Sequence, residues 1–254
     1  ALKIKPDYAQ AYNNMGNILK EKGDLEAAIE SYKKAIKIKP GYADPYNNMG
    51  IALNHKGDLE AAIESYKQAI KIKSDYAQAF NNMGNALKEK GDPEAAINSY
   101  KQALKIRPDY AQAYNNMGIA LKGVVFTKPS SGLQEVISLI IDRKNIVRPI
   151  DISRAAISLL KFEPVMKQLF KKYFASEVKQ SLESLISNLS EAPLLFKLMS
   201  ICPLPDLELE AVFTDTRSAL LTSVTEIENS SEVLRFQSAL ALQCFTNEYV
   251  YSQD

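Results

Sequence analysis

The sequence has very few of the residues that most catalytic and metal sites require. Its 254 residues include one histidine, His55, two cysteines, Cys202 and Cys244, and no tryptophan. Neither cysteine belongs to a CxxC pair, and a single histidine cannot complete a zinc site with them. We therefore interpret both cysteines as buried thiols in a reducing compartment, which predicts a cytoplasmic protein; a disulfide is the alternative.

A strong excess of charge and long apolar runs are also absent. The formal net charge is +1, whereas a nucleic-acid surface normally carries a clear excess of basic residues. No run approaches the roughly 18 apolar residues that a membrane span needs. We expect neither a nucleic acid nor a membrane as partner. Because the chain begins with Ala1 and lacks a first methionine, we interpret it as a fragment of a longer protein.

The sequence does contain a repeat with a period of 34 residues. Four glycines follow this period: Gly16, Gly50, Gly84 and Gly118. We predict two helices in each unit, because apolar residues recur every three or four positions on both sides of a turn such as Gly23-Asp24. Glycine suits the left-handed end of the first helix, and aspartate can cap the start of the second. Pro40 is expected to end that second helix.

This pattern resembles the tetratricopeptide repeat (TPR). The resemblance rests on seven positions and their counterparts in the later units: Tyr12, Gly16, Leu19, Ala28, Tyr32, Ala35 and Pro40. It implies an all-α fold in which residues 1–122 form a right-handed superhelix, or α-solenoid. The solenoid would hold the end of one repeat in 1–8, full repeats in 9–42, 43–76 and 77–110, and the first helix of a fourth in 111–122.

The period stops after Lys122. Residues 123–132 contain glycine, proline and serine, which predicts a linker. Residues 133–254 regain helical periodicity without the repeat, which predicts an irregular all-helical domain. Its first apolar face is Leu133, Val136, Ile137, Ile140 and Ile141. Later helices are expected at 152–161 after a cap at Asp151, and at 164–173, 176–189, 191–201, 206–226 and 232–251.

Catalytic machinery is missing from this pattern. No glycine follows Gly132, so the second half lacks the Gly-rich turn that brings a backbone close to a nucleotide or S-adenosylmethionine. A histidine-dependent mechanism would have to use His55, which stands where neighbouring repeats have Glu21 and Glu89. We interpret His55 as a solvated residue and predict that this chain is not an enzyme and binds no cofactor or metal.

Asparagine doublets are the most unusual feature of the first helices: Asn13-Asn14, Asn47-Asn48, Asn81-Asn82 and Asn115-Asn116. Asparagine is a mediocre helix former, so their presence needs a reason, which is either simple descent by duplication or binding. A carboxamide can donate to a peptide C=O and accept from a peptide N–H together. The second asparagines, namely Asn14, Asn48, Asn82 and Asn116, resemble the asparagine ladder in the repeat domain of O-linked N-acetylglucosamine transferase. This resemblance implies recognition of an extended protein segment.

Further residues are predicted to share the peptide-binding wall with both asparagines of each doublet. They lie one and two turns beyond the doublets: Asn17, Lys20, Asn54, Asn85, Lys88 and Lys122. The lysines also partly fit the carboxylate clamp of chaperone-type repeats, which holds a C-terminal acid. Asn54 replaces the clamp lysine in the second repeat, which weakens that interpretation.

The second half carries a resemblance of its own. The stretches ISLLKFEP, LMSICPLPDLELE and RFQSALALQCFTNEYVY resemble the helical segment between repeats and methyltransferase domain in some bacterial proteins. This implies that a domain using S-adenosylmethionine belongs to the same longer protein. We therefore predict a non-catalytic protein–protein interaction module that binds an extended peptide. The alternative is a scaffold that pairs with another copy through the open solenoid end at Leu2, Ile4 and Tyr8 and through the C-terminal helices.

Overall fold

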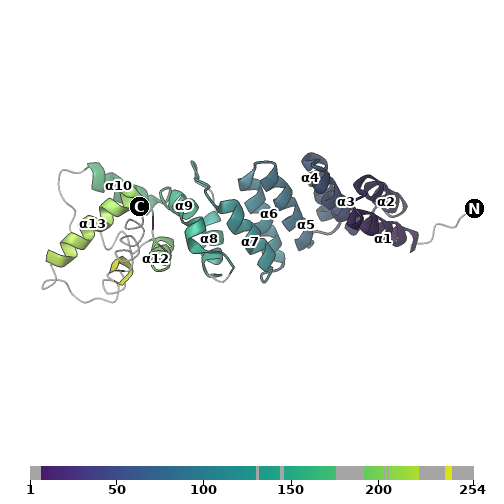
Figure 1. The fold of residues 1–254 in the computed structure, drawn as a ribbon. Coiled ribbons are helices and arrows are strands. Elements are labelled where there is room, and N and C mark those ends of the chain that lie inside the picture. The colour runs from purple at the N-terminus through teal and green to yellow at the C-terminus, as the bar shows by residue number, and fades with distance from the viewer. Residues whose placement is uncertain are drawn as a thin grey trace, which may run out of the picture. The chain divides into compact units, whose positions relative to one another are not determined.

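The computed structural model describes residues 7–129, 132–143, 146–175, 192–202, 204, 206–222 and 238–241. Within these residues all regular structure is α-helical, and the chain divides into two compact units, Ala1–Ala120 and Leu121–Asp254 (Figure 1). The predicted all-α fold, a repeat solenoid and then further helices, is confirmed.

Pairs of antiparallel helices build the first unit. Their bounds are α1 (Asp7–Glu21), α2 (Leu25–Ile38), α3 (Ala43–Lys56), α4 (Leu59–Ile72), α5 (Ala77–Glu89), α6 (Pro93–Ile106) and α7 (Ala111–Leu121). Helix α1 packs against α2, α3 against α4, and α5 against α6. Helices α2 and α4 also contact the first helix of the following pair, so the repeats form a continuous stack.

The turn inside each repeat follows from its Gly-Asp pair. Gly23, Gly57 and Gly91 have φ values of 82°, 87° and 88°, a left-handed conformation that glycine adopts without steric cost. Asp24 then caps α2, since its Oδ1 accepts from the backbone N–H of Ala27 at 3.1 Å. The same cap recurs in the next two repeats. The predicted helix end and cap are both confirmed.

The end of the second helix does not depend on proline. Helix α2 ends two residues before Pro40, and α4 ends at Ile72, two residues before Ser74. After α4 the backbone N–H of Tyr76 donates to the carbonyl of Lys73 at 3.2 Å, and the Lys73 ammonium lies 4.9 Å from the Tyr76 ring centre. The helix end was therefore predicted correctly at Pro40, but the shared turn determines it and the proline does not.

Inside each repeat the two helices approach closely because a glycine faces a tyrosine ring. Three such pairs recur: Gly16–Tyr32, Gly50–Tyr66 and Gly84–Tyr100. A Cβ atom placed on Gly50 would lie 2.6 Å from Cε1 of Tyr66, well inside the contact distance of two carbon atoms. The tyrosines are buried, so each ring fills the space that the missing side chain leaves.

Neighbouring repeats share small apolar cores. One cluster joins Ala28, Ile29 and Tyr32 of α2 to Ala52 of α3, and an equivalent cluster joins α4 to α5. Ion pairs also cross this boundary, such as Lys56 Nζ and Glu26 Oε1 at 3.0 Å. Because both side chains of that pair are largely exposed, the apolar contact contributes more to stacking than the ion pair does.

Five helices of the second unit have both ends in its described part. They are α8 (Leu133–Ile141), α9 (Pro149–Leu160), α10 (Pro164–Ala175), α12 (Pro193–Met199) and α13 (Leu207–Thr222). Helix α8 packs against α9 and α12. The predicted apolar face of α8 is buried along its whole length, and Asp206 caps α13 by accepting from the backbone N–H of Leu209 at 3.1 Å. No helix in the described part of the chain has the length and apolar character needed to cross a membrane.

Helix α9 begins earlier than predicted. Pro149 is its first residue and Arg148 precedes it, so Asp151 lies in the first turn and does not cap the helix. Proline fits this position because the first turn needs no N–H donor from it. The Asp151 carboxylate instead accepts from the Arg148 guanidinium at 2.9 and 3.2 Å. This hydrogen bond is the main cause that lowers the pKa of Asp151.

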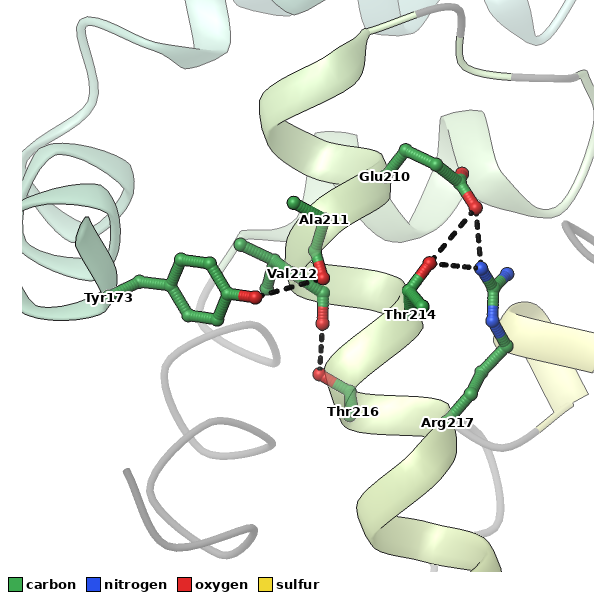
Figure 2. A network of polar contacts seen from close by, with 7 residues as sticks. All are labelled: Tyr173, Glu210, Ala211, Val212, Thr214, Thr216 and Arg217. Carbon is green, nitrogen blue, oxygen red and sulfur yellow. Dashed lines mark hydrogen bonds and ion pairs between the residues drawn. The ribbon is translucent and has the colours of Figure 1, made fainter. Parts of the chain in front are cut away.

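A polar network connects α10 with α13 (Figure 2). The Tyr173 hydroxyl donates to the carbonyl of Ala211 at 3.0 Å. On α13, Arg217 pairs with Glu210 and donates to Thr214 Oγ1 at 2.9 Å. Of these bonds only that of Tyr173 joins the two helices, whereas the bonds among Glu210, Thr214 and Arg217 lie within α13 on its other side.

Cys202 fits its predicted role as a buried thiol. It is 3% exposed, and burial raises the pKa of its thiol to about 11. Other expectations concern residues outside the described part: Cys244, Leu2 and Ile4, the helix at 176–189, and most of the helix at 232–251. Residues 238–241 within that last range are helical.

The glycine–tyrosine contact yields a stability prediction. Gly50→Ala is expected to lower the free energy of unfolding by about 1–3 kcal/mol, because the added methyl group forces the Tyr66 ring to move. Alanine is otherwise the better helix former by about 1 kcal/mol, so a loss identifies the clash. Gly41→Ala is the control, since nothing lies within 4 Å of its Cβ position. Urea unfolding followed by circular dichroism measures both; equal midpoints would contradict the packing argument.

Candidate functional site

The asparagine doublets lie where the first helices of neighbouring repeats face each other. Helix α1 contacts α3, and α3 contacts α5, whereas the second helices of neighbouring repeats contact each other less. The stack is therefore tighter on the side of the first helices, which makes this its inner side. Every doublet is on one of these helices, at the same position in each repeat.

The two asparagines of a doublet have different surroundings. The first asparagines, Asn13, Asn47 and Asn81, are 4%, 1% and 0% exposed. The second asparagines are partly exposed or exposed. Buried side chains cannot touch a peptide in this conformation, so in the first three doublets the contact predicted for both residues is open only to the second one.

Hydrogen bonds between repeats join the two kinds of asparagine. The Nδ2 amide of each later second asparagine donates to the Oδ1 of the first asparagine one repeat earlier, always at 3.0 Å: Asn48 to Asn13, Asn82 to Asn47, and Asn116 to Asn81. Since a carboxamide has two N–H donors and an oxygen with two lone pairs, each of these three amides keeps one N–H and at least one acceptor position, with Asn48 Oδ1 already accepting one bond from Asn47. That pair of groups matches one N–H and one C=O of an extended peptide.

A longer and weaker hydrogen bond links two of these asparagine pairs. Asn47 Nδ2 donates to Asn48 Oδ1 at 3.4 Å, so the amides run in sequence from Asn82 through Asn47 and Asn48 to Asn13. In such a chain each amide polarises the next, which strengthens the individual bonds. The first two asparagine pairs therefore form one connected network, whereas the pair of Asn116 and Asn81 stands apart from it.

The ends of the ladder differ from its middle. Asn14 is exposed, and its Oδ1 accepts from Gln10 Nε2 at 2.9 Å instead of forming an asparagine pair. Asn115 is exposed, unlike the other first asparagines. No further doublet follows it one period later, where the sequence has Pro149-Ile150. The paired ladder thus has three units, at Asn48, Asn82 and Asn116.

Asn17 and Asn85 form hydrogen bonds with buried tyrosines of their own repeats. Asn17 Oδ1 accepts from the Tyr32 hydroxyl at 2.9 Å, and Asn85 Oδ1 accepts from the Tyr100 hydroxyl at 2.8 Å. Burial, with a smaller contribution from Glu21, raises the pKa of Tyr32 to about 12. The predicted peptide contact by these two asparagines is thus limited to their amide N–H groups.

The other residues that were predicted to line the peptide-binding wall have different surroundings from one another. Asn54 Nδ2 donates to Glu89 Oε2 at 3.0 Å, and Lys20 and Lys88 are partly buried. Lys122 lies in the second unit, where its Nζ is 3.3 Å from Asp151 Oδ1. The Asp151 partner of Lys122 was not foreseen because it lies 29 residues away, outside the repeat. Within the described residues no group of three or more His, Cys, Asp or Glu side chains could hold a metal ion.

Comparisons with known proteins identify the repeats of the first half. The family model described as "TPR repeat" matches residues 16–54, 52–91 and 84–123, and the model "Tetratricopeptide repeat" matches residues 1–30. Together they cover the helix pairs and the ladder. No curated protein sequence matches the chain.

Solved structures are similar to about half of the chain. The second TPR domain of human RPAP3, in complex with an HSP70 peptide, is 26% identical, with 46% of this chain and 98% of that chain covered and a TM-score of 0.44. MamA is 28% identical, with coverages of 47% and 70% and a TM-score of 0.43. An O-GlcNAc transferase from Thermobaculum terrenum is 22% identical, with coverages of 55% and 26% and a TM-score of 0.47.

The tyrosine–asparagine bonds provide a matched pair of variants. Tyr100→Phe is expected to lower the free energy of unfolding by about 0.5–1.5 kcal/mol, because it removes the hydroxyl that donates to Asn85. Tyr66→Phe should lower the free energy of unfolding by less, since Ile51 stands in the place of the asparagine and has no acceptor. Urea midpoints of the two variants test this difference; a greater loss for Tyr66→Phe would refute it.

Proposed function

We propose that the tetratricopeptide repeats of residues 1–123 bind an extended polypeptide segment along the ladder of Asn48, Asn82 and Asn116, with Asn14 at its open end. The main support is that each of the three paired amides keeps one N–H and at least one acceptor position on its oxygen for a ligand. They recur every 34 residues on the inner side of the stack. A regular series of this kind fits a ligand that is itself regular, and an extended peptide backbone is such a ligand.

The chemistry of the ladder favours recognition of main chain over side chains. Every peptide unit has the same N–H and C=O groups, so a carboxamide paired with them accepts many sequences. Neighbouring side chains would add selectivity. Ile119 is 51% exposed and lies close in sequence to Asn116, so it supplies an apolar contact for a ligand side chain.

The expected affinity is modest. Three amides with two hydrogen bonds each, at about 0.5–1.5 kcal/mol net per bond, give roughly 3–9 kcal/mol. Ordering a flexible peptide costs about 2–5 kcal/mol or more, before the loss of overall motion. The ladder alone therefore supports binding in the micromolar range or weaker, and tighter binding requires side-chain contacts.

The resemblance of residues 130–254 to methyltransferase-linked helices supports a more specific role. In that role the repeats recruit a protein segment for a catalytic domain of the same longer protein. Residues 1–254 then act as the non-catalytic recruiting module. This extension stays a prediction that rests on the resemblance.

Removal of two ladder amides tests the proposal. The double variant Asn48→Ala, Asn82→Ala is expected to lose at least tenfold in affinity, because up to four hydrogen bonds to the peptide disappear. The probe is a fluorescent twelve-residue peptide selected on the parental chain from a randomised library, and anisotropy titration measures the dissociation constant. Asn98→Ala, which removes an exposed asparagine of α6, is the control. Equal affinity of the double variant and the parent would reject the ladder as the binding site.

Self-association is a second candidate function, favoured by the exposed apolar side chains of α1. Met15 is 48% exposed and Ile18 is 54% exposed, whereas Ala52, the counterpart of Ile18 in the second repeat, is completely buried. The preceding repeat covers Ala52. A second copy of the chain would cover Ile18 in a similar way.

Sedimentation velocity tests whether the chain self-associates. A self-associating chain should sediment faster as its concentration rises, and Ile18→Asp should abolish that dependence because it places a charge in the contact. Ile72→Asp, at an exposed isoleucine of α4, should leave the dependence unchanged. A sedimentation coefficient that stays constant up to millimolar concentration would exclude self-association.

A further inference from the structure

We infer that the buried asparagines Asn13, Asn47 and Asn81 are positioning residues, which hold the ladder amides in the one orientation that a peptide can use. This inference rests on the proposed function and deepens it. None of these side chains would contact the ligand, since they are at most 4% exposed. Each instead accepts a hydrogen bond at 3.0 Å from the ladder amide of the next repeat.

The need for positioning follows from the chemistry of the amide group. A carboxamide rotated by 180° exchanges its N–H groups for its oxygen, so a peptide that met a donor now meets an acceptor. A partly exposed asparagine without a partner would sample both orientations. The Oδ1 of Asn47 can only accept, so it selects the orientation in which Asn82 presents Nδ2 toward it.

One positioning residue, Asn47, is itself held in place by a hydrogen bond. Asn47 Nδ2 donates to Asn48 Oδ1 at 3.4 Å, which keeps the oxygen of Asn47 turned toward Asn82. The Nδ2 atom of Asn81 is buried and is without a hydrogen-bond partner among the described residues. An unpaired buried amide is costly, so its presence is better explained by the task of its oxygen than by stability.

The chain contains its own control position. Asn115 occupies the same place in its helix as the positioning residues, but it is exposed. The residue 35 positions further on, where the next ladder amide would stand, is Ile150. A substitution at Asn115 therefore changes the same residue type at the same repeat position without removing a support for a ladder amide.

Two substitutions separate the hydrogen bond from simple packing. Leucine has nearly the size and shape of asparagine, so Asn47→Leu fills the buried space but offers no acceptor. Aspartate at this buried position favours its protonated form, so Asn47→Asp keeps an acceptor oxygen toward Asn82 and an O–H donor toward Asn48 Oδ1. If Asn47 acts by holding the Asn82 amide, aspartate preserves the effect and leucine abolishes it.

A first measurement needs no ligand. In the 15N-labelled chain of residues 1–254, the Asn82 side-chain amide should show one proton shifted downfield and protected from exchange by its bond to Asn47. Asn47→Leu should remove that shift, Asn47→Asp should retain it, and Asn115→Leu should leave the Asn82 signal unchanged. An unaltered Asn82 signal in Asn47→Leu would overturn the inference.

The second measurement is peptide affinity, with the same fluorescent selected peptide as probe. Loss of a fixed side-chain orientation is expected to weaken binding roughly twofold to tenfold in Asn47→Leu. Asn47→Asp should stay within twofold of the parent, as should Asn98→Leu at the exposed asparagine of α6. Asn13→Leu, which acts on Asn48, should weaken binding similarly and provides a second variant if Asn47→Leu is poorly folded by circular dichroism.

The outcomes are distinguishable from a failure of the proposed function. If the double variant of Asn48 and Asn82 loses affinity but Asn47→Leu and Asn13→Leu do not, the ladder binds peptide without positioning residues and the inference is overturned. If the double variant also keeps its affinity, the binding site itself is wrong. If Asn47→Asp binds as weakly as Asn47→Leu, the acceptor is irrelevant and the inference likewise fails.

Discussion

The contact between a glycine and a tyrosine ring is the interaction on which the rest of the solenoid depends. Gly50 lets α3 lie directly on the ring of Tyr66, and the same contact recurs at the other glycine–tyrosine pairs. Because the buried ring also takes part in the cluster that joins α4 to α5, a single side chain sets the distance within a repeat and between repeats. The regular spacing of the asparagine amides follows from this repeated contact.

That spacing lets two adjacent asparagines do different work. Consecutive residues of a helix point about 100° apart, so one member of each doublet faces the neighbouring repeat while the other stays open. Asn47 is buried and Asn48 is partly exposed for this reason. Buried acceptors and open amides thus occur side by side, and the buried acceptor fixes the orientation of a polar side chain on the surface.

Departures from the repeat also have physical consequences. Ile51 replaces the asparagine that bonds to tyrosine in the first and third repeats, and it packs against the cluster around Tyr66 instead. Asn54 replaces a lysine and reaches Glu89 in the next repeat. Lys122 keeps the lysine but pairs with Asp151. The wall beside the ladder therefore differs from repeat to repeat, while the 3.0 Å bond between ladder amide and buried asparagine recurs in all three pairs.

Local rules in the sequence determined the helices, their caps and their period, because a left-handed glycine such as Gly23 and a capping Asp24 act within a few residues. The same rules located the asparagine doublets and the apolar face that begins at Leu133. Only the tertiary structure separated Asn47 from Asn48, because burial by the next repeat depends on contacts 34 or more residues apart. It likewise assigned Asn85 to Tyr100 and Lys122 to Asp151, since the pairing of polar atoms depends on which helices meet.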